Sequence, residues 1–487
     1  MYKTIDEINK QINKGPYKDT WESLQNKHIP NWFKQDKFGI FIHWGLYSIP
    51  AFNNEWYPRN MYIEGSEEYE YHIKTYGQHK DFGYKDFIKL FKAEHFNAKQ
   101  WVEAIKNSGA KYLVQVAEHH EGFQMYKSNI SKWNVYDMGP KIDILGEIRK
   151  ELRNNNLKFG ASSHRAEHWF FLSHGRKFDS DIKDNLQKGD FYWPSEPEQD
   201  NYDFSSKKAP SQEFLEDWLV RTVEIIDTLK PEILYFDWWI QHESFKPYLK
   251  KVAAYYYNFA YHNNMEVTIC YKHDAFHNGV GVKEIERGRF KEIKHFPWQT
   301  ETSIANNSWA YTKNQNYKSL NEILTLLIDV VSKNGNLLLN VGPKADGMFP
   351  SYEVNILNET GKWLNINGEA IYNSISYETF GEGPTIEKEG MFSEEKFTYT
   401  NEDFRFTVNN GAIYVFILNP KETNKFIIKT LKKANPDDHE GIFSNIKKVT
   451  LLENKANIKF EHLPEGLILN LEKHNFDKPI VFKVETE

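Results

Sequence analysis

Six short, mostly apolar runs recur along the first 342 residues of this chain, and helix-like segments separate most of them. The runs lie at 38–43 (FGIFIH), 112–118 (YLVQVAE), 159–163 (FGASS), 233–237 (ILYFD), 267–272 (VTICYK) and 337–342 (LLLNVG). Runs that are apolar on both faces are typical of parallel strands covered by helices. Helix-like apolar spacing appears at 97–108, 142–154, 211–229 and 320–332. This alternation predicts either an α/β barrel or a doubly wound sheet.

Polar residues at the ends of the predicted strands favour the barrel. They are His43, His119 and His120, His164 and Glu167, Asp237, and Lys272 with Asp274. In a β/α barrel the carboxyl ends of the strands carry the active site. A dinucleotide-binding sheet would instead need GxGxxG after its first strand, and this chain has none there. We therefore predict a (β/α)8-like barrel of the TIM type over residues 1–376.

The pattern changes in the last part of the chain, residues 377–487. Short alternating stretches occupy 404–408, 412–418, 426–429, 449–452, 456–460, 467–471 and 479–484, with turn residues between them. Alternation with such spacing predicts a C-terminal antiparallel β-sandwich. The polar stretch 176–210 has little periodicity and reads as a barrel loop.

Composition excludes several classes of protein. Aromatic residues make up 16% of the 487 residues, which is unlike a disordered chain, and one cysteine (Cys270) cannot form an internal disulfide. The net charge of −7 gives no electrostatic argument for nucleic acid or an anionic membrane as partner. Neither a signal-like segment nor a membrane-length apolar stretch is visible, so we expect a soluble protein. The sequence leaves the compartment, cytoplasmic or exported, and the oligomeric state open.

Asp237 is the first candidate for chemistry. It closes a buried strand and precedes Trp238 and Trp239, so its carboxylate would stand among rings at the barrel mouth. Such a group can attack an electrophilic carbon or stabilise a developing cation. His119 and His120 are the second candidates, as neutral rings that hydrogen-bond a polyol. We predict neither metal nor cofactor, because HxH and HExxH spacing and cysteine clusters are absent from the sequence.

Two further motifs, His43-Trp44-Gly45 and Glu55-Trp56-Tyr57, combine polar groups with aromatic rings. Sugars need this mixture, because their C–H faces stack on rings while their hydroxyls hydrogen-bond. We expect Trp44 and Trp238 among the rings that line such a pocket. A glycosidase also requires a second carboxylate. The residues alone do not rank its candidates, which are Glu284, Glu286, Glu292 and Glu301.

Together these motifs resemble the α-L-fucosidases of glycoside hydrolase family 29. The similar segments are FGIFIHWG and EWY near residues 38–57, AEHHEGF at 117–123, ILYFDWW at 233–239, SWAY at 308–311, DVVSKNGNLLLNVGPKADG at 329–347 and GKWLNINGEAIY at 361–372. The resemblance covers most of the chain. It implies a catalytic barrel followed by a β-sandwich, a fucosylated glycan as substrate, and no cofactor.

The resemblance also implies roles for individual residues. Asp237 matches the nucleophile, while His43, Glu55, Trp56, His119 and His120 match residues that hold the fucose hydroxyls. Phe41 and Trp309 match an aromatic pocket around the C5 methyl group. Three positions depart from the family: Glu121 replaces a usual Asp, His164 lies where a Tyr-Ser segment is usual, and Lys272 replaces a usual Arg. Lysine lacks the planar fork of arginine, so contacts near the ring oxygen are expected to differ.

The general acid/base lies in a variable part of this family. We choose Glu286, 49 residues after Asp237 and 12 before Trp298, because relatives have a similar separation. Glu292 is the second choice and Glu301 the third. The expected reaction is retaining exo-hydrolysis of terminal α-L-fucosyl residues by double displacement. Two alternatives stay open: a retaining exo-glycosidase on a fucose-like sugar such as α-L-galactose, and a catalytically silent carbohydrate-binding protein.

Overall fold

A computed structural model describes residues 2–197, 208–421, 423–437, 441–472 and 474–487 of the chain. The predicted loop at 176–210 lies partly outside these residues. The α-helices are α1 (Ile5–Lys14), α2 (Trp21–Leu24), α3 (Asn31–Asp36), α4 (Tyr57–Asn60), α5 (Glu67–Tyr76), α6 (Ala98–Asn107), α7 (Ile144–Asn154), α8 (His168–Phe171), α9 (Gln212–Leu229), α10 (Lys246–His262), α11 (Leu320–Ser332) and α12 (Ser351–Asn367).

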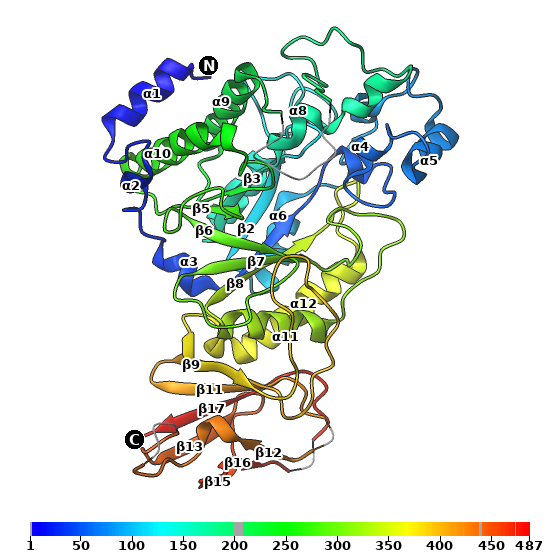
Figure 1. Cartoon of the computed structure of the whole chain (residues 1–487). Helices are drawn as coiled ribbons and strands as arrows, with labels where there is room; N and C mark the ends of the chain where they lie inside the picture. Colours follow the sequence, from blue (N-terminus) through cyan, green and yellow to red (C-terminus); the bar gives the residue numbers. More distant parts are fainter. Residues whose placement is uncertain (1, 198–207, 422, 438–440, 473) are drawn as a thin grey trace.

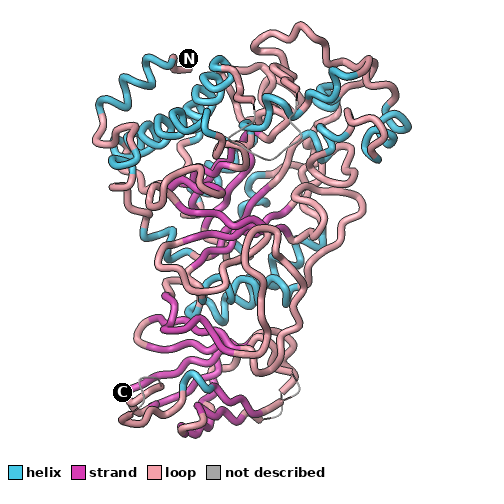
Figure 2. Tube along the Cα trace, viewed as in Figure 1, coloured by secondary structure: helices cyan, strands magenta, loops and turns pink. Residues whose placement is uncertain are grey.

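The first eight strands close into a parallel barrel in the order β1 to β8, with β8 pairing back onto β1. They are β1 (Phe38–Ile42), β2 (Tyr112–Glu118), β3 (Lys158–Ser163), β4 (Ile233–Phe236), β5 (Thr268–Lys272), β6 (Val282–Glu286), β7 (Trp298–Ser303) and β8 (Gly335–Val341). Helices such as α9, α10 and α11 flank this barrel (Figures 1 and 2). The predicted barrel is confirmed.

Strands β6 and β7 are absent from the six apolar runs that the sequence analysis identified. Their side chains face a polar barrel interior, so VKEIE and WQTETS lack the apolar runs that mark the other strands. Glu284, Gln299 and Glu301 are all buried there. The connections on either side of β6, residues 273–281 and 287–297, contain no helix. The usual alternation of strand and helix is therefore interrupted in this part of the barrel.

The C-terminal part forms two antiparallel sheets, as the alternating pattern predicted. A six-stranded sheet has the order β14-β13-β17-β11-β10-β9, and a three-stranded sheet has the order β12-β16-β15. Their bounds are β9 (Ile375–Glu382), β10 (Phe404–Asn409), β11 (Ala412–Ile417), β12 (Lys425–Ile428), β13 (Ile446–Leu451), β14 (Ala456–Asn457), β15 (Lys459–Leu463), β16 (Gly466–Asn470) and β17 (Ile480–Thr486). Buried side chains of both sheets, including Phe406, Phe426 and Phe482, form one apolar core.

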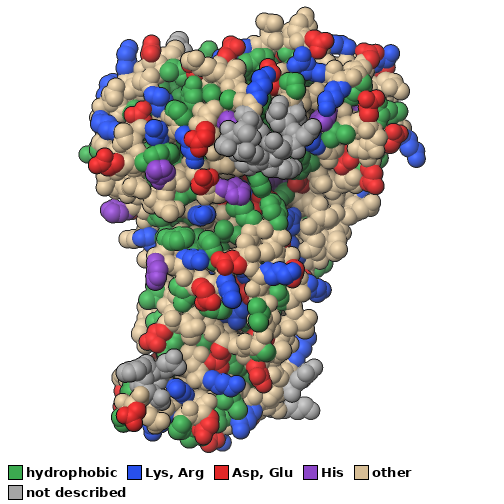
Figure 3. Space-filling view, in the orientation of Figure 1, with side chains coloured by type: hydrophobic (Ala, Val, Ile, Leu, Met, Phe, Trp, Pro, Cys, Tyr) green, Lys and Arg blue, Asp and Glu red, His purple; other side chains and the backbone are tan. Residues whose placement is uncertain are grey.

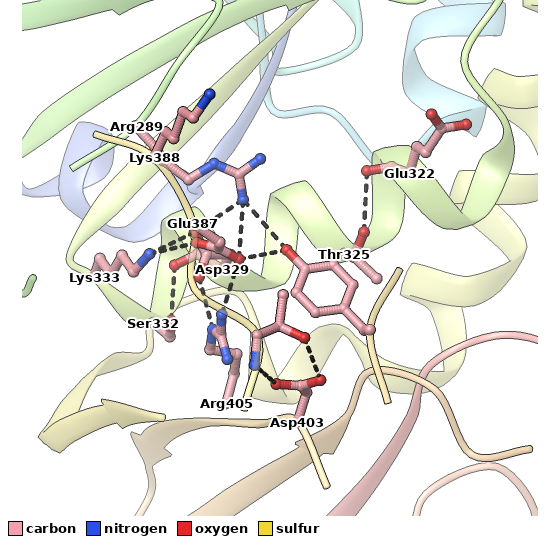
Figure 4. A network of polar contacts seen from close by, with 12 residues as sticks. Arg289, Glu322, Thr325, Asp329, Ser332, Lys333, Glu387, Lys388, Asp403 and Arg405 are labelled. Carbon is pink, nitrogen blue, oxygen red and sulfur yellow. Dashed lines mark hydrogen bonds and ion pairs between the residues drawn. The ribbon is translucent and has the colours of Figure 1, made fainter. Parts of the chain in front are cut away.

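Helix α11 packs against both β8 and the strands β9 and β10, so it joins the barrel to the C-terminal sheets (Figure 1). A buried charge network crosses this junction (Figure 4). Asp329 of α11 contacts Lys333 at 2.8 Å, Arg405 of β10 at 2.7 Å and Arg289 of the barrel at 3.2 Å. Glu387 contacts the same three cations at 2.9, 2.9 and 3.3 Å.

In this network each of the two acids forms ion pairs with all three cations. Burial disfavours a charged Asp329, but the three cations outweigh it and hold the pKa of this carboxyl far below its usual range. The segment between β9 and β10 supplies Glu387, and Tyr399 at its other end donates a hydrogen bond to Glu387. The network therefore fastens both ends of residues 387–399 to the barrel.

On the face shown in Figure 3, acidic and basic side chains are interspersed. No helix in the described ranges is both long and apolar enough to cross a bilayer.

Candidate active site

A cavity of about 630 Å³ opens at the carboxyl ends of the barrel strands. Alternation along each strand directs every second side chain inward. On β4 this places Ile233, Tyr235 and then Asp237 on the inner side, with Asp237 at the mouth. The cavity is lined by Phe41, His43, Asn54, Glu55, Trp56, His119, His120, His164, Glu167, Tyr235, Asp237, Trp238, Trp239, Lys272, Glu286, Glu301, Trp309 and Phe392.

Asp237 lies at the centre of the polar contacts in this cavity. Its Oδ1 accepts from Lys272 Nζ at 2.5 Å, and its Oδ2 accepts from His164 Nδ1 at 3.0 Å. His120 Nε2 lies 3.3 Å from the same Oδ2. Burial alone would raise the pKa of Asp237, but Lys272 and the histidines hold it well below the usual value. Asp237 is therefore a carboxylate with both oxygens oriented by donors.

Lys272, at the end of β5, contacts three carboxyl groups at once. Its Nζ lies 2.5 Å from Asp237, 2.6 Å from Glu286 and 2.8 Å from Glu301. Burial would lower the pKa of Lys272, yet these neighbours raise it well above its ordinary value. A single compact ammonium, at the position where the resemblance implied lysine in place of a usual arginine, therefore lies between three carboxyl groups.

Glu286 is the last residue of β6 and faces Asp237 across Lys272. Lys272 Nζ lies 2.5 Å from Asp237 Oδ1 and 2.6 Å from Glu286 Oε2. These two oxygens are therefore at most 5.1 Å apart, the sum of the two distances. Retaining glycosidases hold their two carboxyl groups about 5–5.5 Å apart, whereas inverting ones need about 6.5–9.5 Å. Trp238 Nε1 donates to Glu286 Oε2 at 3.0 Å, which fixes the orientation of this carboxyl.

The two other acid/base candidates occupy different environments. Glu292 is exposed in the connection after β6 and does not line the cavity. Glu301 lines the cavity floor on β7, where Tyr235 donates a hydrogen bond to its Oε2. Burial raises the pKa of Glu301 to about 7, against the opposing effect of Lys272. Glu301 is the register partner of Glu286 on the neighbouring strand.

One side of the cavity is built around Asn340 of β8. Its Oδ1 accepts from His43 Nδ1 at 2.7 Å, and its Nδ2 donates to the carbonyl of Trp309 at 2.7 Å. Glu55 Oε2 accepts from the backbone N–H of Trp309 at 2.8 Å. Three segments far apart in the sequence are therefore held together by direct hydrogen bonds.

The other histidines of the cavity lie next to His43, whose ring is 5.9 Å from that of His119 and 5.4 Å from that of His164. His120 Nδ1 donates to the carbonyl of His164 at 2.9 Å, and its ring lies 5.6 Å from that of Trp56. Burial opposes a charge on His120, but Glu167 and Asp237 outweigh it and raise its pKa to about 9. Burial lowers the pKa of His119 well below its usual value, so this neighbouring ring is neutral. The two rings reach the same cavity because β2 ends just before them.

The apolar part of the cavity comes from Phe41 and Trp309, whose ring centroids are 6.4 Å apart. Trp44 was also expected in the pocket, and this was wrong. It follows His43 directly, so the alternation of β1 sends it to the outer face, where it packs against Phe91 and Trp101.

Two groups of side chains have donor atoms close enough to bind a metal ion. They are His43 with His119 and His164, and His120 with His164 and Asp237; within each group the atoms lie within 4.8 Å of one another. Both Asp237 oxygens already accept hydrogen bonds from Lys272 and His164. A bound cation would have to compete with the Lys272 ammonium beside this carboxylate.

Residues 4–369 match the sequence family described as Alpha-L-fucosidase. This chain belongs to that family. Its α-L-fucosidase relatives include a Dictyostelium discoideum protein, 27% identical over 486 residues, which covers 94% of this chain and 92% of the relative. The human plasma α-L-fucosidase is 32% identical over 375 residues, covering 74% and 72% of the two chains.

Solved structures of α-L-fucosidases extend the similarity to both parts of the chain. The Thermotoga maritima α-fucosidase superposes with a TM-score of 0.76 at 28% identity, covering 96% of this chain and 100% of that one. The same bacterial enzyme in complex with fucose gives a TM-score of 0.75 and covers 96% and 99% of the two chains. The family and the barrel-plus-sandwich fold, both predicted from the sequence, are confirmed.

Several residues that line the cavity or hold its lining residues escaped the sequence analysis. Asn340 and Tyr235 lie inside apolar runs, where a single polar group reads as part of a buried strand. The period-2 pattern that directs Asp237 inward also directs Tyr235 inward, so this signal was available. Phe392 comes from the segment between β9 and β10, and the sequence carries no signal that links it to the barrel mouth.

Proposed function

We propose that this α-L-fucosidase removes terminal α-L-fucosyl residues from glycans by double displacement, with Asp237 as nucleophile and Glu286 as general acid and base. The assignment is supported by the shared Lys272 contact, which is compatible with the carboxyl separation of a retaining mechanism. Glu301 contacts the same ammonium, and we prefer Glu286 because Trp238 of the cavity wall orients it, whereas Glu301 is held by the hydroxyl of Tyr235.

In the first step Asp237 attacks the anomeric carbon. A covalent glycosyl-enzyme forms, the glycosidic bond breaks, and Glu286 gives its proton to the leaving oxygen. In the second step Glu286 takes a proton from water, whose oxygen attacks the anomeric carbon and releases Asp237. Two inversions retain the configuration. The donors on Asp237 keep it ionised for the attack, and the charge on Lys272 balances the adjacent carboxylates.

The surrounding side chains are suited to bind one sugar ring. His43 bonds Asn340 through Nδ1, and its Nε2 bonds none of the described residues, which leaves this atom for a sugar hydroxyl. His119, His120, Glu55 and Trp56 add polar groups and a ring. Phe41 and Trp309 give the apolar surface that a C5 methyl group prefers over CH₂OH, a preference of about 1–3 kcal/mol.

The test is chemical rescue of the nucleophile variant. Asp237→Gly removes the attacking carboxylate, so we expect hydrolysis of an aryl α-L-fucoside to fall by several orders of magnitude and azide to restore part of it as a fucosyl azide. Near-normal activity without azide would remove Asp237 from the role. Parallel assays with aryl α-L-galactoside examine the alternative substrate, and loss of all hydrolysis in the unmodified chain with retained fucose binding would favour a binding protein.

A further inference from the structure

The segment between β9 and β10 returns to the barrel and runs beside the acid/base candidate. The backbone N–H of Phe392 donates to the carbonyl of Glu286 at 2.8 Å, and that of Glu394 donates to the carbonyl of Arg287 at 2.9 Å. Gly390 and Arg289 form a bridge in the same antiparallel arrangement. These contacts lie along the connection between β6 and β7, where the barrel has no helix.

The close approach depends on Gly288. A Cβ atom added at this position would lie 1.8 Å from the carbonyl oxygen of Gly390, a distance that no packing rearrangement of side chains relieves because both partners are backbone. The carboxylate of Glu394 adds a second attachment, since it accepts from Thr302 Oγ1 at 2.9 Å and contacts Lys318 at 3.0 Å. Together with the buried network around Asp329, this fixes the segment on the barrel.

Phe392 is held in a costly conformation by this attachment. Its φ angle is 54°, in the left-handed region that bulky residues rarely adopt. Phe392 is nevertheless 57% exposed, so burial does not offset the strain. The ring stacks beside Trp238 with 6.1 Å between centroids and 27° between planes. An exposed, strained aromatic ring next to a catalytic candidate indicates a binding role.

Phe392 also lines two neighbouring cavities. It lines the 630 Å³ cavity around Asp237 and a second, polar cleft of about 530 Å³. Arg287, Asn306, Lys318 and Glu395 are among the residues that line this second cleft. Since Trp238 donates to Glu286, the two rings stand on the side of the cavity from which the leaving group is protonated.

We propose that Phe392 and Trp238 form the wall that receives the leaving-group sugar, stacking on the C–H face of a neutral pyranose, and that the polar cleft beyond Phe392 takes the next sugar of the glycan. The C-terminal part of the chain then contributes directly to substrate selection. This inference rests on the proposed fucosidase reaction and adds to it the side on which the remainder of the glycan lies.

The experiment compares two substrates that share fucose and differ in the leaving group. A fucosyl oligosaccharide places a sugar on the proposed wall, whereas α-L-fucosyl fluoride has a leaving group too small to reach it. We expect Phe392→Ala to lower kcat/KM for the oligosaccharide by about 10-fold or more relative to its effect on the fluoride, mostly through KM. Phe392→Tyr keeps a ring and should restore the oligosaccharide activity.

The matched control is Phe443→Ala, which removes another exposed ring (64%) from the C-terminal part and should change neither activity. Thermal unfolding of each variant reports whether it is folded. Equal effects of Phe392→Ala on both substrates, in a folded variant, would overturn the proposed wall while leaving the reaction intact. Absence of hydrolysis of either substrate by the unmodified enzyme would overturn the proposed function, and the wall with it.

Discussion

The ammonium of Lys272 lies 2.5 Å from the carboxylate of Asp237 and is buried with it at the end of the barrel. Two more carboxyl groups, those of Glu286 and Glu301, contact the same ammonium. The ion pair is therefore the centre of a group in which one cation faces three acids. Its geometry orients the nucleophile candidate and sets its distance from the acid/base candidate.

Removing the Lys272 cation should lower both the unfolding free energy and the activity. Lys272→Met leaves the acids uncompensated in a buried site, and we expect a loss of about 3–5 kcal/mol in unfolding free energy together with loss of activity. Lys272→Arg keeps the charge and should recover most of the stability. Denaturant unfolding measures the first effect, and a Met variant as stable as the unmodified chain would contradict it.

Glu286→Ala should slow the hydrolysis of substrates with poor leaving groups by about 10²–10⁴-fold, because these need the proton most. Activated aryl fucosides should lose much less in their first step. Glu292→Ala is the control, since this side chain is exposed outside the cavity, and its kinetics should stay unchanged. If Glu301→Ala rather than Glu286→Ala showed the leaving-group dependence, the acid/base would be Glu301.

His120 should make stability depend on pH in the alkaline range. Its pKa is about 9 in the folded chain, above the ordinary value of 6.5, so the folded state binds its proton more tightly. The stabilisation is complete below pH 6.5 and is lost as the pH rises through 9, with a range of about 3 kcal/mol. The stability difference between the unmodified chain and His120→Asn should therefore shrink from pH 6 to pH 10. A constant difference would contradict the raised pKa.

The junction network predicts a second stability effect far from the cavity. Asp329→Asn leaves Lys333, Arg289 and Arg405 with one buried acid among them, so we expect a loss of about 3–5 kcal/mol in unfolding free energy. Glu359→Gln removes partly exposed pairs with Lys362 and Lys478 and should cost below about 1 kcal/mol. Equal effects in denaturant unfolding would show that the network adds nothing.

Metal removal should leave the activity unchanged. The two groups of histidine and aspartate atoms are spaced closely enough for a metal, but the Lys272 ammonium already balances Asp237. Dialysis against a chelator followed by assay with an aryl fucoside checks this expectation. Loss of activity that zinc or another divalent ion restores would assign one of these groups as a metal site.

Most of the fold could be predicted from the sequence, because apolar runs and helix periodicity are local signals. Six of the eight barrel strands were visible in this way. Strands β6 and β7 were not, because the buried polar residues Glu284, Gln299 and Glu301 interrupt the apolar pattern. Glu286, the acid/base candidate, belongs to one of these missed strands, whereas Asp237 follows a strand that was recognised.

Motifs located much of the site, both at the strand ends and in loops. His43, His119, Asp237 and Lys272 lie at the ends of predicted strands, and Glu55, Trp56 and Trp309 belong to loop motifs that also line the cavity. Among the three acids, sequence distance does not show that Glu292 is exposed outside the cavity or that Glu286 and Glu301 both share the Lys272 cation with Asp237. Phe392 required long-range packing across 155 residues from Asp237, which no local pattern encodes.

The position of Phe392 outside the barrel has an evolutionary consequence. The proposed catalytic residues Asp237 and Glu286 lie at the ends of strands whose exchange would disturb the barrel, whereas Phe392 belongs to a connecting segment held by backbone hydrogen bonds and charge pairs. Lengthening or recombining that segment can change which glycans are accepted while the catalytic strands stay as they are. We therefore expect changes in the segment between β9 and β10 to alter glycan preference without altering the catalytic strands.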